Sequence, residues 1–240
     1  MSSPADIRGL VPLLLSLNAG YVDTAGFLAL QGLFTAHVTG NFVTLGACLA
    51  LGTSGAVAKV LALPVFCIVV IATRLLGSVL SSRRGAALET LLALKVLLLV
   101  GGAALAIRLG PFYDGDSWKA VLTGMVLVAA MAVQNALHRI HLGSVPPSTL
   151  MTGTTTQIMI GVADLIYADP AMQMRSASKL GLMSLNVLIF GCGCAALFFL
   201  KFGVWCFVWP PLLGALALVL RLLGGGEASA ATSEVLTIRK

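Results

Sequence analysis

The sequence predicts an all-α fold: a polytopic bundle of transmembrane helices, with six to eight membrane segments built from two repeats. Hydrophobic residues make up 58% of the chain and charged residues 10%, and the mean hydropathy is +1.00, all far from the values of soluble globular domains. Apolar segments of about 20 residues, the length that crosses a bilayer core, follow one another along the chain. Polar motifs of the first half recur in the second half.

The candidate membrane segments are mostly apolar and are separated by short loops rich in Gly, Pro and Ser. They are 10–30, 33–51, 60–80, 87–107, 120–137, 150–167, 180–200 and 204–222. We therefore expect a short cytoplasmic head (1–9), a first membrane repeat (10–110), a second membrane repeat (119–223) and a tail (224–240). The tail is predicted to be disordered, because it has too little apolar surface to order itself.

The repeats are recognised by their scarce polar residues. In each copy a polar group near the end of an apolar segment is followed by a Thr-Gly pair, and the intervals between them differ by one residue. The first copy has Asp23 with Thr39, Gly40 and Asn41; the second has Gln134 and Asn135 with Thr152, Gly153 and Thr154. The copies differ where Asn41 corresponds to Thr154.

The segments 33–51 and 150–167 leave two topologies open. If both cross the membrane, the repeats are parallel; if both only dip into it, six helices span and the repeats are inverted. Glycine weakens a helix, so Gly40 and Gly153 favour partly broken helices packed inside the bundle. In both topologies Lys and Arg divide nine to four in favour of the side that holds both termini, which predicts cytoplasmic termini.

Several motifs together resemble a known family. They are Gly20-Tyr-Val-Asp23-Thr-Ala-Gly-Phe27, Phe34-Thr-Ala-His37-Val-Thr39-Gly40-Asn41, Gln134-Asn135-Ala136 and Thr149-Leu-Met-Thr152-Gly153-Thr154. They are similar to those of the YoaK-type family of predicted bacterial membrane proteins, a domain of unknown function, and the likeness runs roughly from Pro12 to Leu222. The resemblance implies a multi-pass protein of the bacterial inner (plasma) membrane. It implies no substrate, mechanism or site.

Asp23 is the strongest candidate for a functional residue. A carboxylate at the centre of an apolar helix costs about 2.5–3.5 kcal/mol on insertion scales, so such residues usually face a bundle interior or water. It could bind an ion, couple transport to a proton, or hold a cationic group. Alternatively, Asp23 lies near a helix end, where it meets water or a basic side chain such as Arg139.

A substrate site at the repeat interface would bring the two sets of polar residues together. The candidate substrate-binding residues are Asp23, Thr39, Gly40, Asn41, Gln134, Asn135, Thr152, Gly153 and Thr154, with Asp23 also the candidate for proton coupling. The alternative is that these residues join helices, since small residues permit close approach and interhelical hydrogen bonds contribute about 0.6 kcal/mol on average.

Other ionisable and thiol groups are weaker candidates. Arg74 and Lys95 have long stems and are expected to reach the membrane surface. His37 could titrate near neutral pH or simply be interfacial. The five cysteines are expected to be packing residues. We expect no metal site and no cofactor.

The sequence favours a small-molecule transporter or permease-like protein, with a hydrophobic or weakly polar substrate, over a non-transport membrane scaffold or accessory subunit. A remote alternative is a rhomboid-like intramembrane protease, because His37-x-x-x-Asn41 and Gly52-Thr53-Ser54-Gly55 resemble its motifs, with His138 or His141 as base. We expect no enzyme activity. The expected partners are the lipid bilayer and an unknown small molecule, with homo-oligomers possible and no nucleic acid, since the cations are scattered.

Overall fold

The computed structural model describes residues 4–81, 87–143, 148–149, 153, 155–156, 159–160, 163 and 176–238. Throughout these residues the regular structure is helical, so the predicted all-α class is confirmed. The elements are α1 (Pro4–Ala29), α2 (Gly40–Leu51), α3 (Ala56–Ser81), α4 (Ala87–Leu109), α5 (Trp118–His141), α7 (Ser176–Phe202), the 3₁₀ helix η1 (Gly203–Val208) and α8 (Trp209–Ile238).

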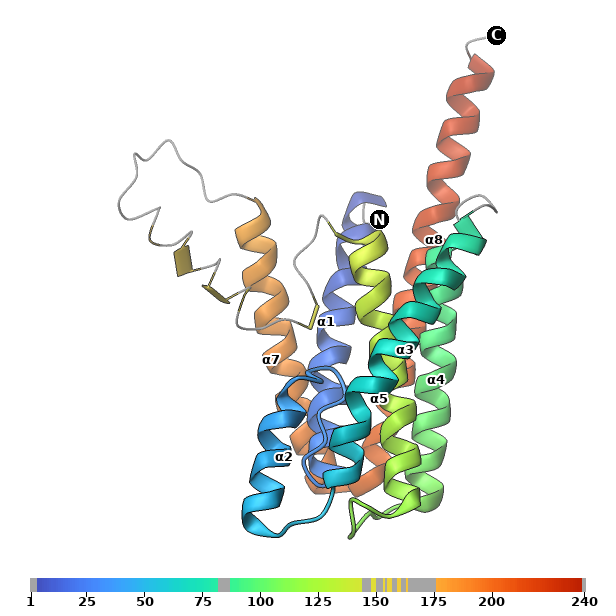
Figure 1. Cartoon of the computed structure of the whole chain (residues 1–240). Coiled ribbons are helices and arrows are strands. Elements are labelled where there is room, and N and C mark those ends of the chain that lie inside the picture. The colour runs from blue at the N-terminus through green and yellow to red at the C-terminus, as the bar shows by residue number, and fades with distance from the viewer. Residues whose placement is uncertain are drawn as a thin grey trace.

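The long helices are apolar enough to cross a membrane. The candidate spans are Leu10–Ala29, Ala56–Leu80, Ala87–Leu109, Trp118–His141 and Leu182–Leu223. The last of these covers most of α7 and the first part of α8, and the chain reverses direction between them at η1 (Figure 1). The six long helices run alternately in opposite directions, so both ends of the chain lie at one end of the bundle (Figure 1), which we name the terminal end.

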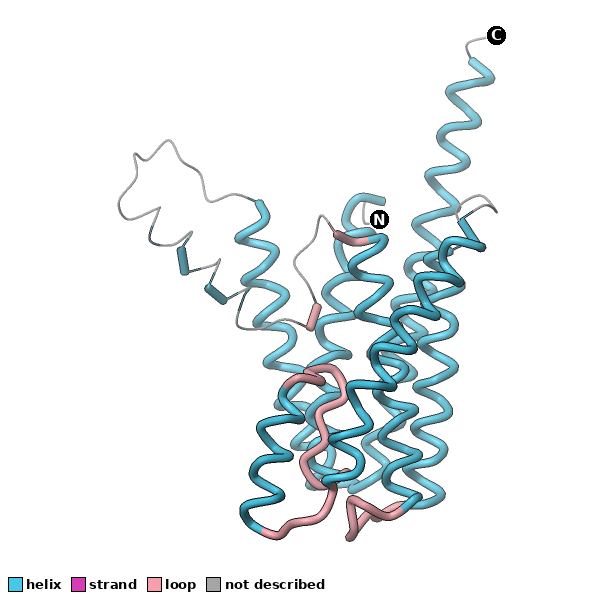
Figure 2. Tube along the Cα trace, in the orientation of Figure 1, coloured by secondary structure: helices cyan, strands magenta, loops and turns pink. Residues whose placement is uncertain are grey.

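The segment 33–51 is not a continuous helix, which agrees with the partly broken helix that the sequence favoured and not with the alternative that it crosses the membrane. α2 has 12 residues, which gives a length of about 18 Å against about 30 Å of bilayer core. The residues before it are irregular, and Gln31 (φ 54°) and Gly32 (φ 82°) reverse the chain after α1. Figure 2 shows the connection 30–39 climbing from the opposite end to about mid-bundle, and α2 returning. This half therefore follows the dipping alternative.

The other segments lie close to their predicted positions. The helix boundaries of α1, α3, α4, α5 and α7 differ from the predicted segments by a few residues. The segment 150–167 falls mainly outside the described residues. α8 continues to Ile238, beyond the bundle (Figure 1), and so includes most of the stretch for which the sequence predicted disorder. A composition that cannot build a packed core can still form a helix.

α1 and α7 approach each other closely through two glycines. A Cβ at Gly20 would lie 2.2 Å from the carbonyl oxygen of Leu188, and a Cβ at Gly191 would lie 2.3 Å from that of Leu17. Any larger residue would therefore push the two backbones apart, as at small-residue interfaces of membrane helices. α1 also contacts α8, whereas α5 packs against α3 and α4.

Lys95 does not reach the membrane surface as the sequence predicted. Its side chain on α4 is 0% exposed, and its Nζ has no hydrogen-bond partner among the described residues. Leu91 and Leu99, one turn away on either side, are also buried in the bundle. The prediction failed because the sequence did not indicate which face of α4 turns inward.

Loops at the end opposite the termini fix where the connection 30–39 begins. Lys59 on α3 is 2% exposed, and its Nζ donates to the carbonyl oxygen of Gln31 at 2.6 Å. The Asp116 carboxylate accepts hydrogen bonds from the backbone N–H groups of Gly55 (2.9 Å) and Val57 (2.8 Å). The first N–H groups of a helix have no partner within the helix, and here the Asp116 carboxylate accepts hydrogen bonds from those at the start of α3. These contacts tie the connection, α3 and the loop before α5 together.

Candidate functional site

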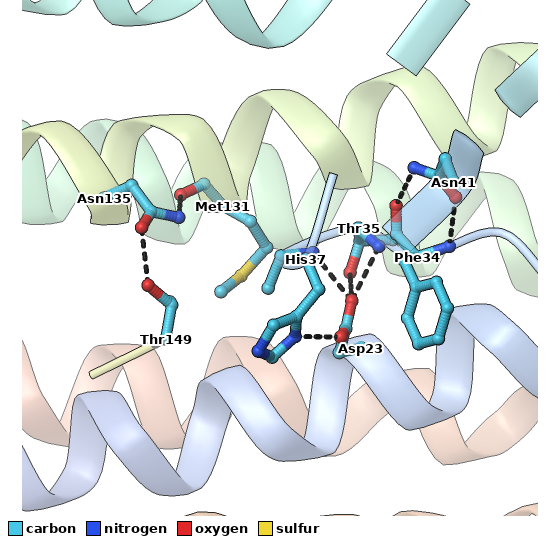
Figure 3. A network of polar contacts seen from close by, with 9 residues as sticks. Asp23, Phe34, Thr35, His37, Asn41, Met131, Asn135 and Thr149 are labelled. Carbon is cyan, nitrogen blue, oxygen red and sulfur yellow. Dashed lines mark hydrogen bonds and ion pairs between the residues drawn. The ribbon is translucent and has the colours of Figure 1, made fainter. Parts of the chain in front are cut away.

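Asp23 holds the connection 30–39 against α1. Its side chain lies two turns before the end of α1 and is 6% exposed. Oδ1 accepts hydrogen bonds from the backbone N–H of Thr35 (2.7 Å), the backbone N–H of Ala36 (2.7 Å) and the Thr35 hydroxyl (3.3 Å), as Figure 3 shows. Bonds to a charged acceptor are the stronger kind. These hydrogen bonds offset the cost of burying the carboxylate, and they satisfy backbone N–H groups that lie outside any helix.

His37 occupies the other oxygen of Asp23. The distance from its Nδ1 to Oδ2 is 2.6 Å (Figure 3). His37 lies in the connection 30–39, outside the candidate spans. The hydrogen bond to Asp23 is the largest cause that raises the pKa of His37 above its usual value, while burial opposes it and the Thr149 backbone adds a smaller favourable effect. Its Nε2 is buried and has no hydrogen-bond partner among the described residues.

Asn41 fixes the bend that leads into α2. It is 1% exposed, its Oδ1 accepts from the backbone N–H of Phe34 at 2.8 Å, and its Nδ2 donates to the Phe34 carbonyl at 2.8 Å. Ser or Ala could not make this pair of bonds. Gly40 packs on the Phe34 ring, which would lie 3.1 Å from an added Cβ. The Asn41 amide therefore positions the start of α2.

An open cavity of about 600 Å³ extends beside the Asp23–His37 pair. Helices α1 and α7 and the connection 30–39 form most of its wall. Its lining residues are Gly20, Asp23, Thr24, Phe27, Leu28, Phe34, His37, Thr39, Gly40, Gly153, Leu188 and Cys192. Four predicted site residues, Asp23, Thr39, Gly40 and Gly153, thus share one cavity.

The second half has a neutral counterpart of the Asp23 network. Asn135 on α5 accepts a hydrogen bond from the Thr149 hydroxyl at 2.5 Å and donates to the Met131 carbonyl at 3.0 Å (Figure 3). Asn135 and Thr149 are 14 residues apart, as are Asp23 and His37. The two pairs therefore share the same sequence interval.

The remaining predicted residues lie elsewhere. Gln134 is fully buried, and its Nε2 donates to the carbonyl of Leu15 on α1 (2.8 Å) and to the Ser148 hydroxyl (3.1 Å), so it joins the two halves. Asn135 lines a second cavity and not the one beside Asp23. Thr152 and Thr154 lie outside the described residues. The Thr149 backbone, close to His37, is where the two networks meet.

The sequence analysis considered His37 as a titratable or interfacial residue and as part of the protease-like motif, and it considered Arg139 as a partner of Asp23. In the described part of the chain the partners of Asp23 are instead His37 and the connection, while Arg139 lines the second cavity. The equal interval of 14 residues was the signal that could have identified His37 and Thr149. Ser54, the nucleophile of the protease alternative, accepts a hydrogen bond from the Gly115 N–H at 3.1 Å in the loops opposite the terminal end.

Comparisons with known proteins agree with the resemblance seen in the motifs. The family described as "Protein of unknown function (DUF1275)" matches residues 11–220. The chain is also similar to the "UPF0700 transmembrane protein YoaK" of Bacillus subtilis (strain 168), with 30% identity over 167 residues, which cover 68% of this chain and 71% of that protein. Solved structures give no significant match.

Proposed function

Since the chain belongs to the DUF1275 family of multi-pass membrane proteins of unknown function, we propose its function from the site: it is a small-molecule transporter or permease-like protein. The substrate binds in the cavity beside Asp23, and the Asp23–His37 pair couples its movement to a proton. One observation carries the proposal: a buried carboxylate, bonded to an imidazole at 2.6 Å, forms part of the wall of a cavity of about 600 Å³. Ionisable groups inside membrane proteins commonly mark such pathways.

The arrangement of the helices supports two repeats of inverted topology. The first repeat contains α1, α3 and α4, and the second contains α5, α7 and α8, each running opposite to its counterpart (Figure 1). In this arrangement α1 corresponds to α5, α3 to α7 and α4 to α8. The contact of α1 with α7 then corresponds to that of α5 with α3, and the contact of α1 with α8 corresponds to that of α5 with α4. All four contacts occur. Transporters with inverted repeats bind substrates near the repeat interface, beside broken helices.

The cavity lining indicates the kind of substrate. Most of its side chains are apolar, among them Phe27, Phe34 and Leu188, and hydroxyls come from Thr24 and Thr39. Its volume of about 600 Å³ is within the range of small-molecule sites. A hydrophobic or weakly polar small molecule suits this lining.

The proton step follows from the geometry of the pair. Because the pKa of His37 is raised, its imidazole keeps a proton at pH values where a free histidine, with a pKa of about 6.5, loses it. Loss of that proton weakens the hold of Asp23 on the connection 30–39. The start of α2 follows this connection through Asn41 and Phe34, so a change in protonation reaches the cavity wall.

We assign both termini to the cytoplasm of the bacterial inner membrane. Arg74 and Lys95, which lie within membrane-spanning helices, are left out of the count, and every other Lys or Arg is assigned to the helix end that it flanks in the sequence. The terminal end then has Arg8, Arg83, Arg84, Arg139, Arg175, Lys179, Arg221, Arg239 and Lys240, and the opposite end has Lys59, Arg108, Lys119 and Lys201. The side with the excess of cations is normally cytoplasmic.

A ligand-dependent thermal-stability screen of the purified full chain tests the binding part of the proposal. A compound at about 100 times its Kd stabilises the folded state by about 2.7 kcal/mol, so compounds that bind in the cavity raise the Tm. We expect Asp23→Asn to weaken the response to such compounds. Asp114→Asn, the same change at an exposed position in the loop before α5, should leave it unaltered. If a compound raises the Tm of both variants by the same amount, the proposed site is contradicted.

A further inference from the structure

We propose that the second cavity, between α3 and α5, binds an amphipathic anion whose phosphate or carboxylate group lies between Arg74 and Arg139. This site is separate from the Asp23 cavity, and the inference does not rest on a transport function. Its volume is about 400 Å³, and its lining residues are Phe66, Val70, Arg74, Asn135, Ala136, His138, Arg139, Ile140, Ser148 and Thr149.

The cavity changes in character along the helices. Phe66, Val70 and Arg74 are four residues apart on α3, so they form one stripe on that helix. With a rise of 1.5 Å per residue, the stripe extends about 12 Å. Its apolar end lies within the bundle, and its arginine lies toward the terminal end, where α3 finishes (Figure 1). A ligand that matches this stripe has an apolar chain and a charged head.

The two arginines come from different helices and both line the cavity. Arg74 and Arg139 are exposed, and neither forms an ion pair or hydrogen bond with the other described residues. Among the described residues that line the cavity none is acidic. Glu89, an acid near the same end of α4, is engaged by Arg221 at 3.0 Å. Two guanidinium groups with no acid between them favour a phosphate or carboxylate, which each can bind in a bidentate manner.

The polar floor of the cavity distinguishes a binding site from two arginines that merely reach the membrane surface. Ser148 is 1% exposed and Thr149 is 3% exposed, and both line the cavity together with Asn135. These groups can accept or donate hydrogen bonds to the ester or headgroup oxygens of a ligand. Basic pockets between membrane helices on the cytoplasmic side bind anionic lipid headgroups. Either a phospholipid of the leaflet or a free amphiphile with the same acidic group could supply the ligand.

Thermal stabilisation of the full chain in neutral detergent, with three probes, tests this proposal. The probes are phosphatidylglycerol, dodecyl phosphate and, as the reference with no net charge, zwitterionic phosphatidylcholine. We expect an anionic probe to raise the Tm of the unaltered protein at concentrations where phosphatidylcholine does not. Arg74→Gln with Arg139→Gln removes both charged donors, so the double variant should require at least about tenfold more probe for half of the shift.

Arg108→Gln is the matched control, because Arg108 is exposed in the last turn of α4 at the opposite end. It should leave the concentration dependence unchanged. If phosphatidylglycerol alone acts, the ligand is a leaflet lipid; if dodecyl phosphate alone acts, it is a free amphiphile; both results support the site. Should the double variant fail to fold, the single change at exposed Arg139 gives the same test. An unchanged response in the arginine variants, or an equal loss in Arg108→Gln, overturns the proposal.

Discussion

Helices α1 and α5 each have a polar residue that is hydrogen-bonded to a residue beyond the end of its helix, yet only the polar residue of α1 is ionisable. Asp23 bonds His37, and Asn135 bonds Thr149, each 14 residues further on. The first pair also holds two backbone N–H groups of the connection 30–39, whereas the second adds one bond within its own helix. The halves thus share a spacing and differ in charge, which indicates that proton sensitivity belongs to the first half.

The largest expected effect comes from removing the two polar residues in turn. Asp23→Ala leaves the backbone N–H groups of Thr35 and Ala36 and the His37 ring without their acceptor. Breaking a buried charged pair in this way costs about 3–5 kcal/mol. Asn135→Ala removes neutral bonds only and should cost about 1–2 kcal/mol. Reversible unfolding in mixed detergent micelles measures both, and equal costs would mean that the two networks are equivalent.

Lys95 provides the opposite case, because it is a buried ionisable group without a network. Its Nζ has no partner among the described residues, so a charge there carries an uncompensated desolvation cost. Lys95→Met keeps most of the volume, and similar replacements of buried charges stabilise proteins by about 1–4 kcal/mol. We expect a higher free energy of unfolding in the same micelles. A clear loss of stability would show that Lys95 has a partner that balances its charge.

Removing the amide of Asn41 should reduce stability less than removing the carboxylate of Asp23, but more than removing the side chain of the exposed residue Thr39. Asn41→Ala removes both bonds to the Phe34 backbone and leaves buried groups unpaired, at a cost of about 2 kcal/mol. Thr39→Ala is the control, since Thr39 is exposed and its side chain makes no capping bond, so its effect should stay within about 0.5 kcal/mol. The midpoint of thermal unfolding compares the two variants. A Thr39→Ala effect as large as that of Asn41→Ala would remove the proposed role of the amide.

The smallest expected effect is a dependence of stability on pH that belongs to the first half alone. The pKa of His37 is raised in the folded protein, so its contribution is fully present below the unfolded value of about 6.5 and is lost as the pH rises through the folded value. Tm measured from about pH 5.5 to 9 should therefore fall less steeply for His37→Gln than for the unaltered protein. Thr149→Val, in the neutral network, should keep the unaltered slope; identical slopes in all three would contradict the assignment.

Much of the fold could be predicted because the length of each apolar segment in the sequence indicates the length of a membrane-spanning helix. α4 begins at Ala87, as predicted, and ends two residues beyond the predicted segment. For the region 33–39 the sequence favoured a partly broken helix but did not predict where the helix begins. The extended course of this region depends on positive φ angles at Gln31 and Gly32 and on the bonds from Asp23. These are tertiary effects that hydropathy does not record.

The site was predicted only in part for the same reason. Asp23 could be singled out as an acid in an apolar segment, whereas its bond to His37 forms because the chain folds back on α1, which the sequence pattern did not predict. Asn41 was assigned to substrate binding, and its amide holds the Phe34 backbone. That assignment stays a prediction. Side-chain direction is the missing information in each case, as it is for Lys95.

Uptake into proteoliposomes tests the central claim most directly. A compound that stabilises the purified protein would be offered to vesicles with and without an imposed pH gradient. The Asp23–His37 pair predicts accumulation driven by the gradient, its loss in Asp23→Asn, and its retention in Asp114→Asn. Uptake that ignores the gradient and is equal in a folded Asp23→Asn variant would contradict the claim that this carboxylate couples transport to a proton.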